Sequence, residues 1–422
     1  MKYVRVGICV LVVFAVAAHG AVEDWARAVL EVGATLLFLV WTVRLYVKGE
    51  QELIISRLLL PLVAFAVIVL AQYFFHWTSV RYATRQELQL LLAYVLLLFL
   101  AAQAFRTIAD FRGFIWFTMA FGFLVALFGI LQHLTFNGKL YWFREMRFGG
   151  IPFGPYVNRN HFAGFVELVI PISVVPLVLG KVRRERWLVV SLFAVVPIGA
   201  LFLSASRGGI VSFGVEMGLL AIWLILRRNA KRHLLSAAAI LLLTFLMVSW
   251  LGVRQSLERF SSMQSLEVTQ GKRTSMASDT WHIFLDHPWI GAGLGTLQDV
   301  FPAYETLYDG KVVNHTHNDY LEALAETGVA GGLCCAWFLG TLFLESLRGL
   351  SQAHGTFAST VQLSGLIACL GFLTHSLVDF NLHIPANALL FFLLANLATA
   401  AIGRPPNELP DLAQSRYRRR KQ

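Results

Sequence analysis

The stretch with the clearest capacity for chemistry is His315-Thr316-His317-Asn318-Asp319, which precedes a run of residues with helical spacing. Asn318 or Asp319 can cap that helix, and Glu322 then lies in its first turn. The positive end of a helix dipole disfavours an imidazolium, so we expect His317 to stay neutral and able to accept a proton. A capping or packing role remains open. So does a metal bound by His315 and His317, although no second pair with ligand spacing accompanies them.

Two arginines form the second chemical element. Arg207 lies in Ser204-Ala205-Ser206-Arg207-Gly208-Gly209, a short connection between two apolar runs, and Arg273 precedes the apolar residues around Trp281. A guanidinium binds phosphate oxygens in a forked manner, so two of them converging on one point would suit a diphosphate. Lipid phosphate is the plain alternative for Arg207, and a solvated loop position is the alternative for Arg273.

The scaffold that positions these residues must consist mainly of membrane helices. Hydrophobic residues make up 57% of the 422-residue chain and charged ones 14%, which is too apolar for a soluble fold. We therefore predict an all-α integral membrane protein with about 12 transmembrane helices, each of roughly the length that crosses a bilayer. They run approximately over residues 4–19, 26–47, 57–75, 87–105, 114–135, 160–180, 187–204, 208–226, 233–252, 328–347, 358–379 and 386–402.

The positions of the cations predict the orientation. Most of the 35 Lys and Arg residues fall in connections on the side of the N-terminus, so both chain ends are expected in the cytoplasm. This distribution also explains the net charge of +10 without nucleic acid. Residues 1–21 resemble a signal peptide as well; we favour an uncleaved span, and either interpretation leaves the later topology unchanged.

The predicted spans divide the chain into four parts. Residues 1–252 hold spans one to nine, 253–327 form a long outer loop with short amphipathic helices, 328–403 hold the last three spans, and 404–422 form a basic cytoplasmic tail. Turns are expected at Asp286-His287-Pro288 and at Gly291-Ala292-Gly293-Leu294-Gly295. The glycine-rich piece follows no strand, so we interpret it as a place of close helix approach and not as a nucleotide loop.

At these residues the chain resembles the O-antigen ligase and polymerase superfamily, which consists of polytopic bacterial enzymes that use polyprenyl-diphosphate-linked glycans. His317-Asn318-Asp319-Tyr320-Leu321 fits the family element His-(Asn/Ser/Ala)-x-x-Leu. Three further segments recur in the family's order: Tyr156 to Ala163, Ser206-Arg207-Gly208-Gly209, and Arg273 followed by Asp286 to Gly293. Together they cover about residues 155–330.

The resemblance implies a GT-C-like glycosyltransferase architecture with its active site at the periplasmic face of the bacterial inner membrane. It implies that His317 activates an acceptor hydroxyl and that Arg207 and Arg273 hold the diphosphate of an undecaprenyl-diphosphate-linked glycan, with Arg159 as a weaker phosphate contact. The acceptor would be a lipid A-core sugar, the displacement would invert the anomeric centre, and no cofactor or metal would be needed. Asp379 is expected to orient Arg207 or His317.

Two alternatives remain open at this level. Within the same chemistry, the enzyme could polymerise O-antigen or exopolysaccharide units, or glycosylate protein. A polytopic transporter is the alternative of a different class, with Glu31, Glu167 and Glu216 inside predicted spans as coupling groups.

Overall fold

The computed structural model describes residues 1–49, 53–145, 151–227, 230–251, 270–353 and 355–402, and within these ranges it contains helices and no β-strand. The first part of the long loop, 253–269, and the basic tail, 404–422, therefore lie outside the described residues. A helix occupies each of the twelve predicted stretches. They are α1 (Lys2–Ala17), α2 (Asp24–Lys48), α3 (Leu59–Phe74), α4 (Arg81–Ala104), α5 (Ile108–Leu134), α6 (Arg159–Val178), α7 (Trp187–Ser204), α8 (Arg207–Leu226), α9 (Ala230–Leu251), α13 (Asp319–Ser351), α14 (Thr356–His375) and α15 (Pro385–Thr399).

Eight helices in the described ranges are long and apolar enough to cross a membrane. Of the others, α3 and α15 are shorter apolar helices of 16 and 15 residues. An all-helical fold is confirmed for the described residues, and the eight candidate spans are consistent with an integral membrane protein, while the count of twelve spans stays a prediction.

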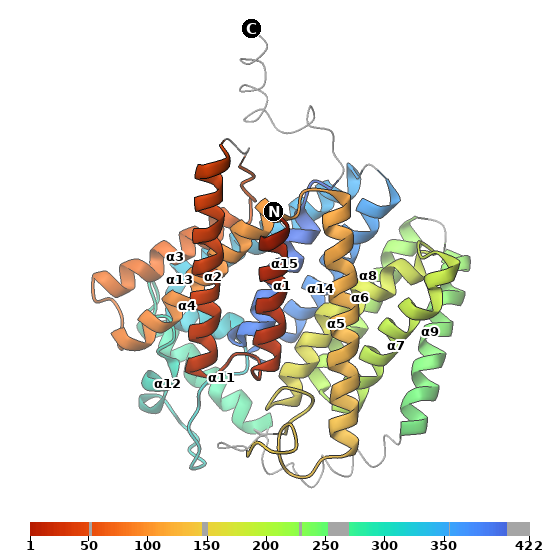
Figure 1. Cartoon of the computed structure of the whole chain (residues 1–422). Coiled ribbons are helices and arrows are strands. Elements are labelled where there is room, and N and C mark those ends of the chain that lie inside the picture. The colour runs from red at the N-terminus through yellow and green to blue at the C-terminus, as the bar shows by residue number, and fades with distance from the viewer. Residues whose placement is uncertain (50–52, 146–150, 228–229, 252–269, 354, 403–422) are drawn as a thin grey trace.

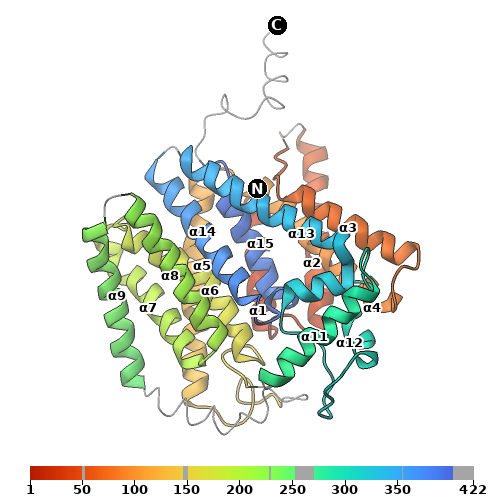
Figure 2. The same ribbon diagram turned by 180° about the vertical axis from the view of Figure 1, so that it is seen from behind.

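The centre of the bundle is α6, which packs against α7 and α14, while α15 packs against both α14 and α6 (Figures 1 and 2). Nearly every residue of α6 is buried, whereas α2 at the periphery buries only a small share of its length. Glycines allow the close approach: a Cβ at Gly164 would collide with the Asn381 side chain, and one at Gly209 with Ala163. Shape complementarity between these helices therefore sets the position of their ends.

Those ends define two faces of the bundle. Helix α14 begins at Thr356 on the face that also carries the chain's N-terminus, and it ends at His375 on the face that carries α11 (Gln270–Asp286) (Figure 1). Helix α6 runs the opposite way, so its first residue, Arg159, lies near the end of α14.

The outer loop has a small core of its own. Beyond α11 it forms α12 (Leu297–Val300) and the short 3-10 helix η3 (Phe301–Ala303). Seven apolar residues pack together there and against the start of α13: Met276, Ile283, Ala292, Leu297, Phe301, Val313 and Ala325. The expected short helices and the expected turn at Gly291–Gly295 are both present, because these three glycines adopt positive φ angles of 81°, 114° and 78°.

Helix α13 bends sharply at Gly328, whose φ of 62° is not helical. The bend breaks the helical hydrogen-bond ladder, and the Pro288–Gly293 segment replaces the missing partners. Ala292 N donates to the Ala325 carbonyl at 2.9 Å, and Val329 N donates to the Pro288 carbonyl at 2.8 Å. A Cβ at Gly291 would strike the backbone of α13, so the glycine-rich turn serves close backbone packing, as predicted.

Gln72, near the end of α3, connects the bend of α13 and the glycine-rich turn to the membrane helices. Its fully buried amide donates to the carbonyls of Ile290 (2.7 Å) and Glu326 (2.8 Å), and its oxygen accepts from Leu294 N (3.1 Å). One side chain thus joins α3, the glycine-rich turn and α13.

We predict that Gln72→Leu destabilises the protein by about 2–4 kcal/mol, because two carbonyls and one N–H lose their buried partner. Thermal unfolding in detergent and the rate of proteolysis between residues 270 and 318 measure this. Gln86→Leu is the control: it removes one hydrogen bond, to the Tyr82 hydroxyl, at an exposed position and should have little effect. Equal stability of the two variants would contradict the anchoring role of Gln72.

Candidate active site

The turn between α14 and α15, residues 376–384, receives contacts from several segments that are distant in sequence. Asp319 N, at the start of α13, donates to the Ser376 carbonyl at 3.0 Å. The His317 ring lies 3.1 Å from Asp379, and Arg273 donates to the Val378 carbonyl at 3.4 Å. His317 and Arg273 therefore contact adjacent residues of this turn, Asp379 and Val378.

His317 is held firmly by its surroundings. Its backbone φ of 55° lies in the left-handed region, which a residue other than glycine adopts only when surrounding contacts compensate for the conformational strain. Asn318 follows as the cap of α13 and accepts from Tyr320 N at 3.1 Å and Leu321 N at 3.0 Å, as predicted. The edge of the His317 ring contacts Phe380, with the ring centres 5.0 Å apart.

Asp379 fixes the orientation of the His317 ring. Burial by itself would raise the pKa of the Asp379 carboxyl, but its interaction with His317, first of all the hydrogen bond, outweighs burial and holds the pKa below its usual range. The carboxylate is therefore ionised and accepts from Nδ1–H of His317, which leaves Nε2 free to accept a proton. Asp379 orients His317, one of the two partners expected for it.

Arg207 is the first residue of α8. Ala205 adopts a left-handed conformation that ends α7, and the Ser206 hydroxyl then caps α8 by accepting from Gly209 N at 3.3 Å. The next residue, Gly208, packs so tightly on His375 and Val378 that a Cβ would not fit. Arg207 thus begins its helix beside the same turn, and its exposed side chain has no hydrogen-bond partner among the described residues.

Arg273 lies inside helix α11, and not ahead of it as the sequence had indicated. The described part of this helix runs from Gln270 to Asp286 and contains no helix breaker after Gly271. Its Nε has no partner among the described residues, although it is buried, and the buried Oδ2 of Asp379 has none either. Two charged groups at this turn therefore keep hydrogen-bonding capacity.

Arg159 is the first residue of α6 and is only 7% exposed. Its guanidinium donates to the Ser204 carbonyl at 3.4 Å, and its backbone N–H donates to the Ile151 carbonyl at 2.8 Å. Arg159 therefore contacts the link between α7 and α8 at Ser204, which precedes Arg207 by three residues. Its side chain already has a hydrogen-bond partner within the protein.

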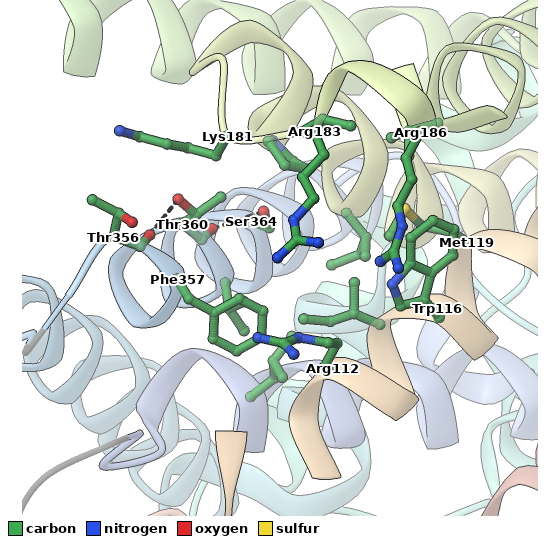
Figure 3. Close-up of a pocket in the computed structure, with 17 residues that line it drawn as sticks. Arg112, Trp116, Met119, Lys181, Arg183, Arg186, Thr356, Phe357, Thr360 and Ser364 are labelled. Atoms are coloured by element: carbon green, nitrogen blue, oxygen red, sulfur yellow. Dashed lines mark hydrogen bonds between the residues drawn. The ribbon is translucent and has the colours of Figure 1, made fainter. Parts of the chain in front are cut away.

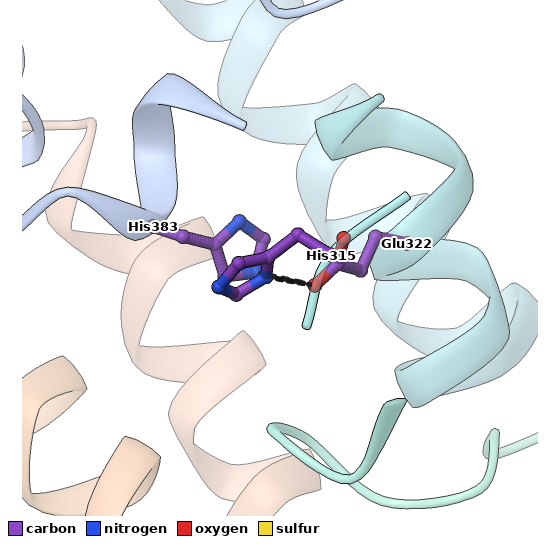
Figure 4. A group of neighbouring side chains, drawn as sticks. All are labelled: His315, Glu322 and His383. Carbon is purple, nitrogen blue, oxygen red and sulfur yellow. Dashed lines mark hydrogen bonds and ion pairs between the residues drawn. The ribbon is translucent and has the colours of Figure 1, made fainter. Parts of the chain in front are cut away.

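A second cluster lies beside His317 and was not predicted. His315 Nδ1 and His383 Nε2 both face Glu322 Oε1, at 2.7 and 3.3 Å, and His383 Nδ1 lies 2.8 Å from Asp319 (Figure 4). Burial would lower the pKa of His383, but the nearby carboxylates of Glu322 and Asp319 raise it to about 10. His383 is therefore an imidazolium that neutralises part of this buried acidic charge.

The same three side chains could hold a metal ion. The ligand atoms of His315, Glu322 and His383 lie within 4.8 Å of one another. Asp319 on Nδ1 of His383 matches the carboxylate that commonly orients a metal-binding histidine. The set chemically fits a divalent cation such as Zn²⁺, but a metal would have to displace the proton of His383.

Some residues of the site gave no sequence signal. His383 follows Glu322 by about sixty residues, so no ligand spacing links them. His375 pairs with Glu167 at 2.9 Å inside the bundle, which gives one of the three carboxylates considered for transport a structural partner. For residues 374–379, the only feature in the sequence that indicated a functional role was their position at the end of a predicted helix.

Residues 192–336 match the family described as O-Antigen ligase. The matched segment contains Arg207, Arg273 and His317, whereas Arg159 and Asp379 lie outside it. The resemblance of the chain to the O-antigen ligase superfamily is therefore confirmed, and the match supports a membrane glycosyltransferase of the ligase or polymerase type. Among curated proteins, none matches the chain significantly.

We predict that stability falls as the pH rises from about 6.5 to about 10, the range between the ordinary and the raised pKa of His383. A raised pKa means that the imidazolium stabilises the fold fully below pH 6.5, and this contribution disappears as His383 loses its proton. Unfolding temperatures measured between pH 6 and 10 test this. His383→Gln should flatten the profile, whereas His282→Gln, at an exposed position on α11, should leave it unchanged. A wild-type profile that is already flat would contradict the assignment.

Proposed function

We propose that the protein is an O-antigen ligase, which transfers a glycan from undecaprenyl diphosphate to a sugar hydroxyl of lipid A-core at the periplasmic face of the inner membrane. The observation that carries the proposal is the pairing of His317 with Asp379 on the turn that also receives Arg273. The family match over the segment with His317, Arg207 and Arg273 supports it. In this orientation both chain termini lie in the cytoplasm.

His317 acts as the general base in this proposal. Its Nε2 takes the proton of the acceptor hydroxyl while that oxygen attacks the anomeric carbon of the donor sugar. The ionised Asp379 accepts from Nδ1–H throughout, so it stabilises the imidazolium that forms. No covalent glycosyl-enzyme is needed, and attack opposite to the leaving group inverts the anomeric centre.

The departing diphosphate takes the electron pair of the broken carbon–oxygen bond. Arg207 and Arg273 hold its oxygens, and they stabilise the negative charge that grows there. Arg207 suits this role because it is exposed and has no partner in the described chain, and Arg273 because its Nε is unoccupied. Arg159 is engaged with the Ser204 carbonyl and has the weaker claim to a phosphate contact.

The acceptor decides between ligase, polymerase and protein O-oligosaccharyltransferase. Purified protein is given labelled undecaprenyl-diphosphate-linked glycan with lipid A-core, with unlabelled donor alone, or with an acceptor protein. We expect label on lipid A-core only, and the same yield in the presence of EDTA, because the proposed displacement uses His317 and the arginines and no metal ion. Ladders of increasing length without lipid A-core would identify a polymerase, and loss of yield that Zn²⁺ restores would contradict a metal-free reaction.

His317→Ala should reduce turnover by roughly 10²–10⁴-fold, the usual contribution of a general base, and leave donor binding largely intact. Asp379→Asn should reduce turnover less, because the base remains but loses its orientation. Initial rates and equilibrium binding of the donor separate the two effects, with His282→Ala as an exposed histidine control. A carrier without transferase chemistry would keep working after His317→Ala, and unchanged turnover would thus overturn the assignment of the base.

Arg207→Ala and Arg273→Ala should each weaken donor binding as well as turnover, by roughly tenfold or more in binding, because a phosphate charge loses a charge-assisted hydrogen bond. Arg85→Ala is the matched control: Arg85 is exposed near the start of α4 and stacks on Tyr82, 5.2 Å from the ring centre. If only turnover falls, with donor affinity unchanged, then these arginines do not hold the ground-state diphosphate.

A further inference from the structure

A cavity of about 360 Å³ lies at the face of the bundle opposite to the candidate active site. Residues near the starts of α5, α7 and α14 and the end of α6 line it. Helix α14 spans the separation, because Thr356 borders the cavity and His375 borders the site, and its 20 residues measure about 30 Å. The cavity is therefore distinct from the glycan-transfer site.

Four cationic side chains line this one space: Arg112, Lys181, Arg183 and Arg186. None of them has an ion-pair partner within the described ranges of the chain. Figure 3 shows the guanidinium groups of the three arginines around a common space, with Lys181 at its rim. Cations gathered in this way repel one another, and an anion in the cavity would relieve that repulsion.

Aromatic rings hold two of the arginines in place. The Arg112 guanidinium lies 5.3 Å from the centre of the Phe357 ring, and Arg186 lies 5.4 Å from that of Trp116 (Figure 3). Stacking on a ring face leaves the N–H edges of a guanidinium free to donate. The cations are thus positioned before any ligand arrives, which reduces the entropy cost of binding.

The hydrogen bonds of the hydroxyl groups on α14 also favour a negatively charged ligand. Thr360 donates to the Thr356 carbonyl at 2.6 Å, and Ser364 donates to the Thr360 carbonyl at 2.9 Å, so both protons are already used. The donors left for a ligand are the four cations and the first N–H groups of α14. A group with several acceptor oxygens and negative charge, such as a phosphate, satisfies such a set.

The remaining lining is apolar and forms the inner wall of the cavity. It includes the buried residues Ile115, Met119, Ile172, Val190, Val361 and Leu397. The glycerol and upper acyl chain of a lipid would contact this wall beside the phosphate, whereas a free phosphate ion would not. The two kinds of lining together favour a molecule with an anionic head and an apolar tail.

We propose that this cavity binds the phosphate of an anionic membrane lipid, with its headgroup among Arg112, Arg183 and Arg186 and its acyl chain along the apolar lining. Basic pockets between transmembrane helices are known to select anionic headgroups. The cation distribution in the sequence places this face at the cytoplasmic leaflet. The lipid joins α5, α6, α7 and α14, and thereby stabilises the packing of the central helices.

The test uses the full-length protein in detergent and native mass spectrometry to measure binding of phosphatidylglycerol, phosphatidylcholine and inorganic phosphate. We expect one phosphatidylglycerol to bind more tightly than phosphatidylcholine. The double variant Arg112→Gln, Arg183→Gln should bind it roughly tenfold or more weakly, because two charge-assisted contacts are lost. Arg184→Gln is the matched control, since Arg184 is an exposed neighbour that does not line the cavity.

Three outcomes would overturn the proposal. Lipid affinity could be the same in the double variant and the wild type, or it could fall as much in Arg184→Gln as in the double variant, which would indicate general attraction to charge. Inorganic phosphate could also compete at concentrations similar to those of the lipid, which would identify a free-anion site. The affected arginines are exposed, so the single variant Arg183→Gln provides the same comparison if the double variant does not fold.

Discussion

The candidate site depends on one constraint: the Asp379 carboxylate is buried and charged, and it must be paired. An isolated buried carboxylate costs far more free energy than a small protein can supply, so the His317 ring is held against it. That requirement fixes the position of the loop before α13 relative to the turn after α14. It also explains the left-handed backbone of His317, because the energy of the buried pair compensates for a strained φ angle.

Two devices keep that geometry in place. The bend at Gly328 directs the first part of α13 towards the turn after α14, and the Pro288–Gly293 segment satisfies the backbone groups that the bend exposes. Helix α11, which carries Arg273, is continuous with this segment, so the position of the arginine depends on the same backbone pairing. Gln72 then attaches the assembly to α3, so the described part of the outer loop, residues 270–327, packs onto the membrane bundle.

The sequence predicts most of the helices because hydropathy and helix caps are local signals. Asn318 caps its helix and Gly291 forms a turn where the pattern indicated, since each depends on its own backbone. Contacts between residues far apart in the sequence could not be predicted in this way. Nothing local to His383 indicates that it meets Glu322, or that Gly208 packs on Val378, because such contacts arise from how the helices pack. The sequence placed Arg273 ahead of the helix around Trp281 and not within it, because helix propensity at a polar boundary is a weak signal.

The His383 cluster shows how a site can resemble a metal centre and still favour a proton. A metal ligand must be a neutral imidazole, and the nearby carboxylates raise the pKa of His383, so at pH 7 a proton competes with metal binding at this ring. The carboxylates that would orient and charge-balance a cation are the same groups that raise this pKa. The contacts of Glu322 with His315 and His383 therefore give the loop before α13 a fixed shape, and with it the position of the neighbouring His317.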